Sequence, residues 1–241
     1  MVTRVLKSSL AAASLALALT ASSSLIAAAQ SGSTTVLGTA NTWYAGLGAP
    51  AGDGTLPTLI QLLAGSSRVL RFSSVTGLIG CCSSINVGPD GYTGQNQYIN
   101  ALGTLSGISV PGALALTGVF LDALGQPVTT PSALDFTVGL AGDFLTLSPV
   151  LGQTFFIGNG YTSGNVQQIF YVPNAATQLY LGIPDACGFN GYPTTCYSDN
   201  PGSFQVSYGV VGTTTTPEPA SMALMATGLV GLFSISRRRR S

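Results

Sequence analysis

The chain has 241 residues, with 8 basic and 8 acidic side chains and no histidine. Between residues 30 and 212 only Arg68 and Arg71 are basic, against seven aspartates, so no basic stripe exists for a nucleic acid. The absence of histidine excludes a Ser-His-Asp triad and an imidazole zinc site. The absence of lysine between residues 30 and 212 excludes a phosphate loop in that part of the chain. We therefore expect a protein that is not an enzyme.

The first 29 residues have the pattern of a secretory signal peptide. Arg4 and Lys7 precede a short apolar run from Leu10 to Leu19, and Ala27–Ala29 offers small residues for cleavage before Gln30. The apolar run is shorter than the ~20 residues that a membrane-spanning helix needs. The sequence therefore predicts export through the inner membrane and removal of residues 1–29.

Residues 30–212 are predicted to form one all-β domain, an antiparallel β-sandwich. Short runs of β-branched and aromatic residues alternate with glycine-rich turns, which is typical of that architecture. Trp43 and Tyr44 are expected in its core, and Arg68 and Arg71 are expected to form salt bridges. A short helix is expected at Leu59–Leu63. The expected strands are 67–75, 114–121, 134–140, 144–147, 154–157, 168–172, 178–181 and 203–211.

Four cysteines lie in the exported part of the chain: Cys81, Cys82, Cys187 and Cys196. An oxidising compartment favours disulfides, and four cysteines allow three pairings. A bond between adjacent cysteines closes a strained ring, so cross-links from the Cys81–Cys82 pair to Cys187 and Cys196 are favoured. The sequence alone leaves the pairing open.

A loop rich in oxygen donors is predicted near the end of the domain. Asp185 follows a strand, and Asp199 and Asn200 directly precede the final strand. Carboxylate and amide oxygens are the ligands that calcium prefers, so a hairpin that joins these residues would form a calcium site. The alternative is an ordinary turn, which Asp-Asn-Pro-Gly favours without any ligand.

The C-terminal end has three parts. A polar linker (213–219) ends in Pro217, Glu218 and Pro219, an apolar segment (220–236) follows, and residues 237–241 contain four arginines. We expect the apolar segment to be a transmembrane helix with its basic tail in the cytoplasm. A plain C-terminal membrane anchor, the alternative, would have the same two features. The three-part pattern resembles the PEP-CTERM sorting signal. The resemblance implies an exosortase-type protease as partner, transient anchoring in the inner membrane, and a destination at the cell surface or in the extracellular matrix.

The body resembles the bacterial calcium-dependent galactose-binding lectins. The segments NVGPDGY (86–92), GALALTG (112–118), QQIFYVPNAATQLYLGIPDA (167–186) and YSDNPGSFQV (197–206) follow that family's order. The resemblance implies a jelly-roll, galactose-binding-like sandwich. It also implies calcium held by Asp185, Asp199 and Asn200 with the carbonyls of Cys196 and Cys81, which would bring those two cysteines close together.

The sugar-binding part of that resemblance is incomplete. The family's histidine is absent, and the corresponding region offers Gln95, Gln97 and Tyr98. Phe189 and Tyr192, in a loop longer than the family's, are expected to pack on the sugar ring. The sequence thus predicts a calcium-binding surface protein that binds an extracellular polysaccharide. The alternative is a structural surface protein without a specific ligand, in which calcium is at most stabilising.

Overall fold

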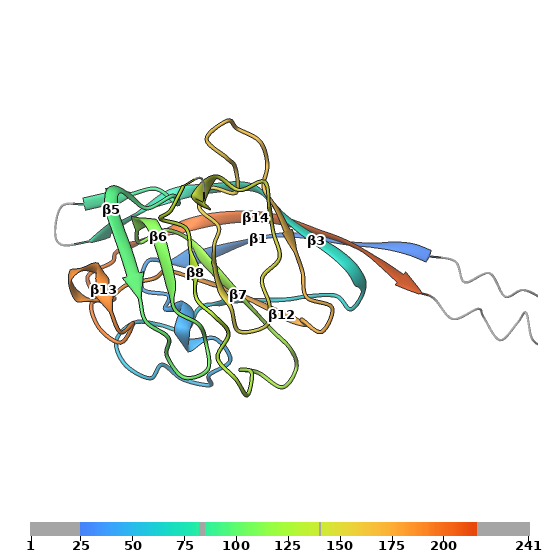
Figure 1. The fold of residues 1–241 in the computed structure, drawn as a ribbon, viewed down its shortest axis with the longest axis horizontal. Helices are drawn as coiled ribbons and strands as arrows, with labels where there is room; N and C mark the ends of the chain where they lie inside the picture. Colours follow the sequence, from blue (N-terminus) through green and yellow to red (C-terminus); the bar gives the residue numbers. More distant parts are fainter. Residues whose placement is uncertain (1–24, 82–84, 140, 216–241) are drawn as a thin grey trace, which may run out of the picture. The chain divides into compact units, whose positions relative to one another are not determined.

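The computed structural model describes residues 25–81, 85–139 and 141–215, which fold into three β-sheets around one hydrophobic core (Figure 1). The predicted all-β class is confirmed. Helical structure in these residues is limited to three short 3₁₀ turns: η1 (Thr42–Tyr44), η2 (Ala141–Asp143) and η3 (Cys187–Phe189).

The largest sheet is built on the long central strand β14 (Gly202–Thr215). It pairs antiparallel with β1 (Leu25–Leu37) on one side and with β3 (Ser66–Cys81) on the other. Valine and phenylalanine occur in both β3 and β14, and the alternation of buried and less buried residues places one face of each strand on the core. The remaining strands of this sheet are β4 (Ile85–Val87), β11 (Ile169–Tyr171) and β9 (Thr146–Leu147).

Two smaller sheets complete the domain. In the first, β7 (Thr117–Leu121) is buried at every position, as expected for a continuous apolar run in the middle of a sheet. The order of this sheet is β10 (Thr154–Phe156), β7, β12 (Gln178–Gly182) and β2 (Thr58–Gln61). The order of the second is β13 (Asn190–Gly191), β5 (Tyr92–Ile99), β6 (Ile108–Ala113) and β8 (Leu134–Asp135).

Phenylalanine rings connect the sheets through the core. Phe170 on β11 lies 5.5 Å from Phe155 on β10, and Phe155 stacks on Phe120 of β7 at 5.0 Å between ring centroids. Phe156 of β10 then reaches Phe136, just after β8, at 5.8 Å. Such ring pairs add about 0.5–1.5 kcal/mol each beyond the area they bury, so this chain of rings fixes the sheets against one another.

Several expectations for the body need correction. The predicted helix at Leu59–Leu63 is wrong, because this segment forms β2 and pairs with β12. The sheets are not purely antiparallel, since β9, β13 and β8 each pair parallel with a neighbour. Arg68 is buried and binds three backbone carbonyls, those of Leu63, Pro173 and Asn174, at 2.7–3.0 Å instead of a carboxylate. Trp43 and Tyr44 are buried, as predicted.

The two ends of the chain lie mostly outside the described residues. This applies to the expected signal peptide up to residue 24, and to the Pro-Glu-Pro motif and apolar segment within 216–241. In the described part, no helix is long and apolar enough to cross a membrane. The strand β1 begins at Leu25, five residues before the expected cleavage point, and its first residue pairs with Thr215.

Candidate functional site

Asp185 and Asn200 meet in the interior of the domain. The amide Nδ2 of Asn200 donates a hydrogen bond to Asp185 Oδ2 over 2.7 Å, and the exposed fractions of the two side chains are only 3% and 0%. Asp185 follows β12 and Asn200 precedes β14, so both strand ends position the pair. The sequence-based prediction that these two residues converge is therefore confirmed.

Asp185 and Asn200 form few hydrogen bonds for two buried polar side chains. Asp185 accepts from Asn200 and from the N–H of Ala186 at 2.7 Å, whereas Asn200 Oδ1 has no hydrogen-bond partner although it is buried. Burial raises the pKa of Asp185 to about 7, against the lowering effect of its two hydrogen bonds, and the negative charges of Asp199 and Asp53 add to the increase. A buried carboxylate without a positive partner is costly, which is why its neutral form is favoured.

Two further residues hold the surrounding loop. The buried hydroxyl of Tyr197 accepts from the N–H of Asp185 at 2.9 Å and donates to the carbonyl of Ile183 at 3.2 Å. Asp53, from the loop before β2, accepts from the backbone N–H groups of Tyr197 and Ser198 at 2.8 and 3.0 Å. Partial burial would raise the pKa of Asp53, but hydrogen bonds from Ser198, Tyr197 and Gly54 outweigh this and lower it. Sequence reasoning assigned no role to either residue: no motif marks Asp53, and Tyr197 only opens the YSDNPGSFQV segment.

The same loop is closed by a disulfide between Cys187 and Cys196, nine residues apart. The favoured cross-links from Cys81 and Cys82 to these cysteines are therefore wrong. The loop doubles back through η3 and β13, and this brings its two ends to a Cα–Cα distance of 5.3 Å. Cys81 is buried at the end of β3, and Cys82 lies outside the described residues.

The other expected calcium ligands lie around the pair but do not complete a cluster. Asp199 is exposed and forms no hydrogen bond with Asp185 or Asn200 within the described residues. Cys196 has a left-handed backbone with φ 70°. The N–H of Gly80 donates to the carbonyl of Pro201, which brings the end of β3, and hence Cys81, beside Asn200. No three acidic, cysteine or histidine side chains gather for a metal in residues 25–81, 85–139 and 141–215.

Three of the expected carbohydrate-binding residues come together at one sheet edge. Asn190 on β13 lies opposite Tyr98 on β5 in the register, and its Oδ1 accepts from the Tyr98 N–H at 3.1 Å. Phe189 and Tyr192 flank β13, so they lie at the same edge of the sheet as Tyr98, although Phe189 is partly buried and packs against the core. Tyr98 and Tyr192 are exposed, with fractions of 48% and 63%. A hollow of about 310 Å³ adjoins Tyr98, between β5 and β6.

The two glutamines do not join this edge in the same way. Gln97 is fully buried, and its Oε1 accepts from the N–H of Leu114 at 3.0 Å, so the side chain ties β5 to the end of β6. Gln95 donates to the carbonyl of its neighbour Asn96. In this structure only Tyr98, Phe189 and Tyr192 of the five expected residues form a common edge.

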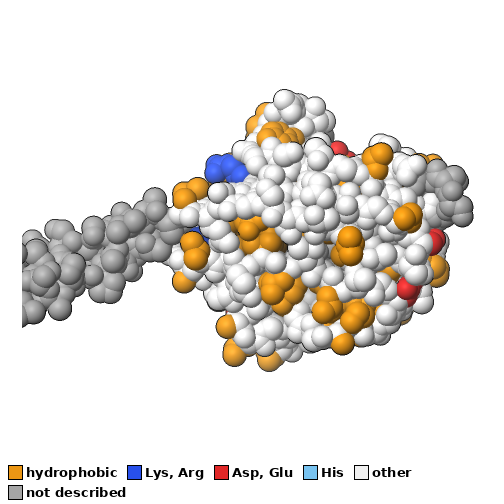
Figure 2. Space-filling model, turned by 180° about the vertical axis from the view of Figure 1, so that it is seen from behind, with side chains coloured by type: hydrophobic (Ala, Val, Ile, Leu, Met, Phe, Trp, Pro, Cys, Tyr) orange, Lys and Arg blue, Asp and Glu red, His pale blue; other side chains and the backbone are white. Residues whose placement is uncertain are grey.

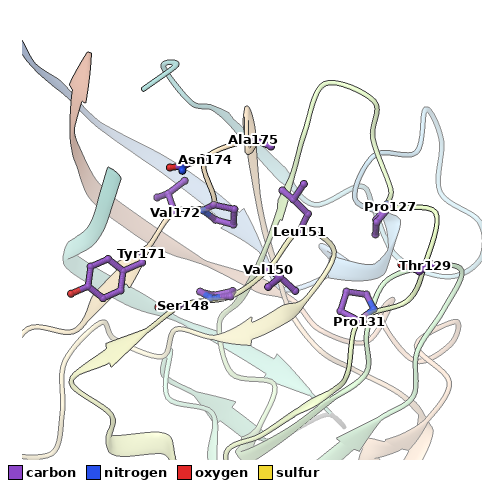
Figure 3. Close-up of a pocket in the computed structure, with 12 residues that line it drawn as sticks. Pro127, Thr129, Pro131, Ser148, Val150, Leu151, Tyr171, Val172, Asn174 and Ala175 are labelled. Atoms are coloured by element: carbon purple, nitrogen blue, oxygen red, sulfur yellow. The ribbon is translucent and has the colours of Figure 1, made fainter. Parts of the chain in front are cut away.

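The surface carries few charges, and Figure 2 shows apolar side chains scattered singly over one face. A groove of about 790 Å³ is mostly apolar and lacks charged side chains (Figure 3). Pro127, Pro131 and Tyr171 contribute to its walls, but nothing in it resembles a catalytic or metal-binding arrangement. We therefore regard the loop between Asp185 and Asn200 as the better candidate site.

Comparison with known proteins identifies one family, at the C-terminal end. Residues 215–240 match the model of the PEP-CTERM protein-sorting motif. This match supports an exported protein that is processed by an exosortase and sorted by way of the membrane to the cell surface. No curated protein and no solved structure matches the chain.

Proposed function

We propose that the protein is a surface-sorted β-sandwich that binds one calcium ion at Asp185 and Asn200 and a carbohydrate at the adjoining edge. The observation that carries the proposal is the buried Asp185–Asn200 pair, in which one oxygen has no partner and no positive charge balances the carboxylate. The sorting motif accounts for delivery to an extracellular, calcium-containing environment.

The donor set fits calcium. A half-turn of the Asn200 amide exchanges Nδ2 for Oδ1, and the oxygens of both side chains then face one cation. Calcium takes six to eight oxygen ligands, so the carbonyls near Cys196 and Cys81 and the carboxylate of Asp199 are the natural additions. The cation would keep Asp185 ionised, because an opposite charge favours the charged form.

The carbohydrate part of the proposal depends on Tyr98 and Tyr192. Two exposed aromatic rings at one sheet edge offer flat apolar faces of the kind on which a pyranose ring packs, with hydroxyls at their tips. Tyr192 belongs to the loop that links Asp185 to Asn200, and β13 of that loop pairs with β5, which carries Tyr98, so ion binding and sugar binding would involve one ordered segment.

A specific observation favours a second candidate, a structural surface protein without a ligand. The loop is already held by the Cys187–Cys196 disulfide and by Asp53, so its fold does not require an ion. In that case the Asp185–Asn200 bond is an ordinary buried hydrogen bond.

Calcium titration of the full-length chain in detergent separates the two candidates. An extracellular site is expected to bind at ~10⁻⁴–10⁻³ M. At a tenfold excess over the dissociation constant, binding stabilises the fold by about 1.4 kcal/mol, which raises Tm by roughly 3–5 °C. The Asp185→Asn variant should lose this response, whereas Asp122→Asn, in a turn outside the loop, should keep it. An unchanged Tm for the unmodified protein at 10 mM calcium, roughly ten times the weaker constant, contradicts the proposal.

A glycan-binding assay tests the carbohydrate half separately. Tyr192→Ala should weaken binding to immobilised polysaccharide in calcium without changing the calcium response of Tm. Equal binding by Tyr192→Ala and the unmodified protein would exclude this edge as the contact surface.

A further inference from the structure

A second cleft, of about 480 Å³, lies outside the Asp185–Asn200 loop. It is formed where three loops meet: the turn before β5, the segment after β8, and the connection between β10 and β11. We call it the Asp90–Asp143 cleft. Its principal lining residues are Asp90, Phe136, Asp143, Phe156, Asn159 and Tyr161.

Asp90 and Asp143 lie in two of these segments, which are far apart in the sequence. Both carboxylates are held by the third segment, the connection between β10 and β11. Asp90 Oδ1 accepts from the N–H of Asn159 at 2.8 Å. Asp143 accepts from both the N–H and the hydroxyl of Ser163, the latter at 2.8 Å. Each carboxylate is therefore fixed in orientation by residues 159–163 before any ligand arrives, which reduces the entropy lost on binding.

A glycine makes the first of these contacts possible. At Gly158 the backbone has φ +59°, and a Cβ there would lie 2.4 Å from Asp90 Oδ1. A larger residue would push Asp90 away from Asn159 and open the cleft. The two loops can therefore approach this closely because residue 158 is a glycine.

The chemistry of the lining defines the ligand class. The lining contains no lysine, arginine or histidine, so nothing in it would balance a phosphate, sulfate or uronate. Hydrogen bonds from Ser163 lower the pKa of Asp143, which keeps that carboxylate ionised as an acceptor. The rings of Phe136 and Phe156, which pack at 5.8 Å, and of Tyr161 supply apolar walls. Acceptors beside aromatic walls suit a ligand with many hydroxyl donors and apolar ring faces.

We infer that the Asp90–Asp143 cleft binds a neutral saccharide through hydroxyl groups donated to Asp90 and Asp143. This goes beyond the proposed function, because the cleft contains none of the residues of the calcium loop and needs no calcium. The protein would then have two separate contact points for a polysaccharide.

The test uses the full-length chain in detergent and immobilised tetrasaccharides of glucose, galactose, mannose and glucuronate. We expect binding to at least one neutral tetrasaccharide that persists in EDTA, and no binding to the glucuronate. Asp143→Asn and Asp90→Asn should each weaken that binding at least tenfold, while Asp122→Asn, at a half-buried aspartate outside the cleft, should not. Unchanged Tm in each variant verifies that the fold is intact.

The outcomes separate this inference from the proposed function. Binding that EDTA abolishes and that Asp90→Asn and Asp143→Asn leave unchanged would overturn the cleft and support the calcium loop. Preference for glucuronate, or no binding to any neutral tetrasaccharide, would also overturn the cleft, whatever the calcium titration shows. If both variants have a lower Tm than the unmodified protein, Thr93→Gln, at an exposed lining position on β5, serves as the second probe and should reduce binding by obstruction.

Discussion

The carboxylate of Asp185 lies 2.7 Å from the side-chain amide of Asn200, and neither side chain reaches solvent to any useful extent. The two residues are fifteen positions apart, yet the ends of β12 and β14 bring them together. This pairing makes the stability of the domain depend on the protonation of one carboxylate.

In calcium-free solution, stability should fall as the pH rises from about 4 to about 7. The pKa of Asp185 is near 3.9 in the unfolded chain and about 7 in the folded protein. The neutral carboxyl therefore stabilises the fold fully below about pH 3.9, and this stabilisation is lost as the pH rises through about 7. The full difference amounts to at most about 4 kcal/mol. Urea unfolding at several pH values in EDTA measures it, and Asp185→Asn should flatten the curve. A slope unchanged by the substitution would show that other groups cause it.

Calcium affinity should increase with pH. Because the ion requires ionised Asp185, binding below pH 7 releases one proton. The apparent dissociation constant should therefore decrease about tenfold from pH 5.5 to 6.5, and level off above the pKa of about 7. Isothermal titration calorimetry in two buffers of different ionisation enthalpy counts the proton directly. A pH-independent constant would place the ion elsewhere.

Removal of the disulfide should destabilise the domain without unfolding it. The Cys187–Cys196 bond closes a loop of about ten residues, for which chain entropy predicts about 2.7 kcal/mol. The double variant Cys187→Ser with Cys196→Ser should lower the free energy of unfolding by this order, because Asp53 and β13 still hold the loop. Urea denaturation checks it. A loss close to zero would mean that these other contacts restrain the loop equally well in the reduced chain.

Arg68 and Arg71 form a matched pair for testing a buried cation. Arg68→Met leaves the carbonyls of Leu63, Pro173 and Asn174 without their donor, and an unsatisfied buried group costs about 1–3 kcal/mol. Arg71 is more exposed and makes no comparable set of contacts in the described residues, so Arg71→Met should change stability by less than about 0.5 kcal/mol. Equal effects of the two substitutions would show that the carbonyl contacts add little.

The sequence predicted the strands that carry continuous or alternating apolar residues. β3, β7, β12 and β14 fall within or around the expected ranges, because burial of valine, leucine and phenylalanine dominates there. β1 was missed because its Gln-Ser-Gly-Ser-Thr-Thr run has little apolar content, and β5 and β6 because Gln97 and Pro111 interrupt the pattern. A helix was expected in place of β2, since five residues with four apolar side chains do not distinguish the two periods.

The candidate site could be predicted only where chain connectivity defines it. Asp185 and Asn200 flank one hairpin-like loop, so their approach follows from the strands on either side. The contribution of Asp53 could not be foreseen, because that residue arrives from a loop more than 140 positions away. The Asp90–Asp143 cleft has the same origin, since its carboxylates meet through tertiary packing and each is marked in the sequence only by adjacent glycines.

The register of β1 on β14 also has a consequence for how the domain is displayed. Thirteen residue pairs run from Leu25–Thr215 at one end to Leu37–Ser203 at the other, a span of roughly 40 Å, and the eight pairs from Gln30–Val210 to Leu37–Ser203 would remain after the expected cleavage before Gln30. The peptide that leads to the sorting motif departs beside the first pair, while Asn200 and its loop follow the last. The loop that carries Asp185 and Asn200 therefore lies at the opposite end of β14 from Thr215, so the length of that strand separates the proposed ion site from Thr215.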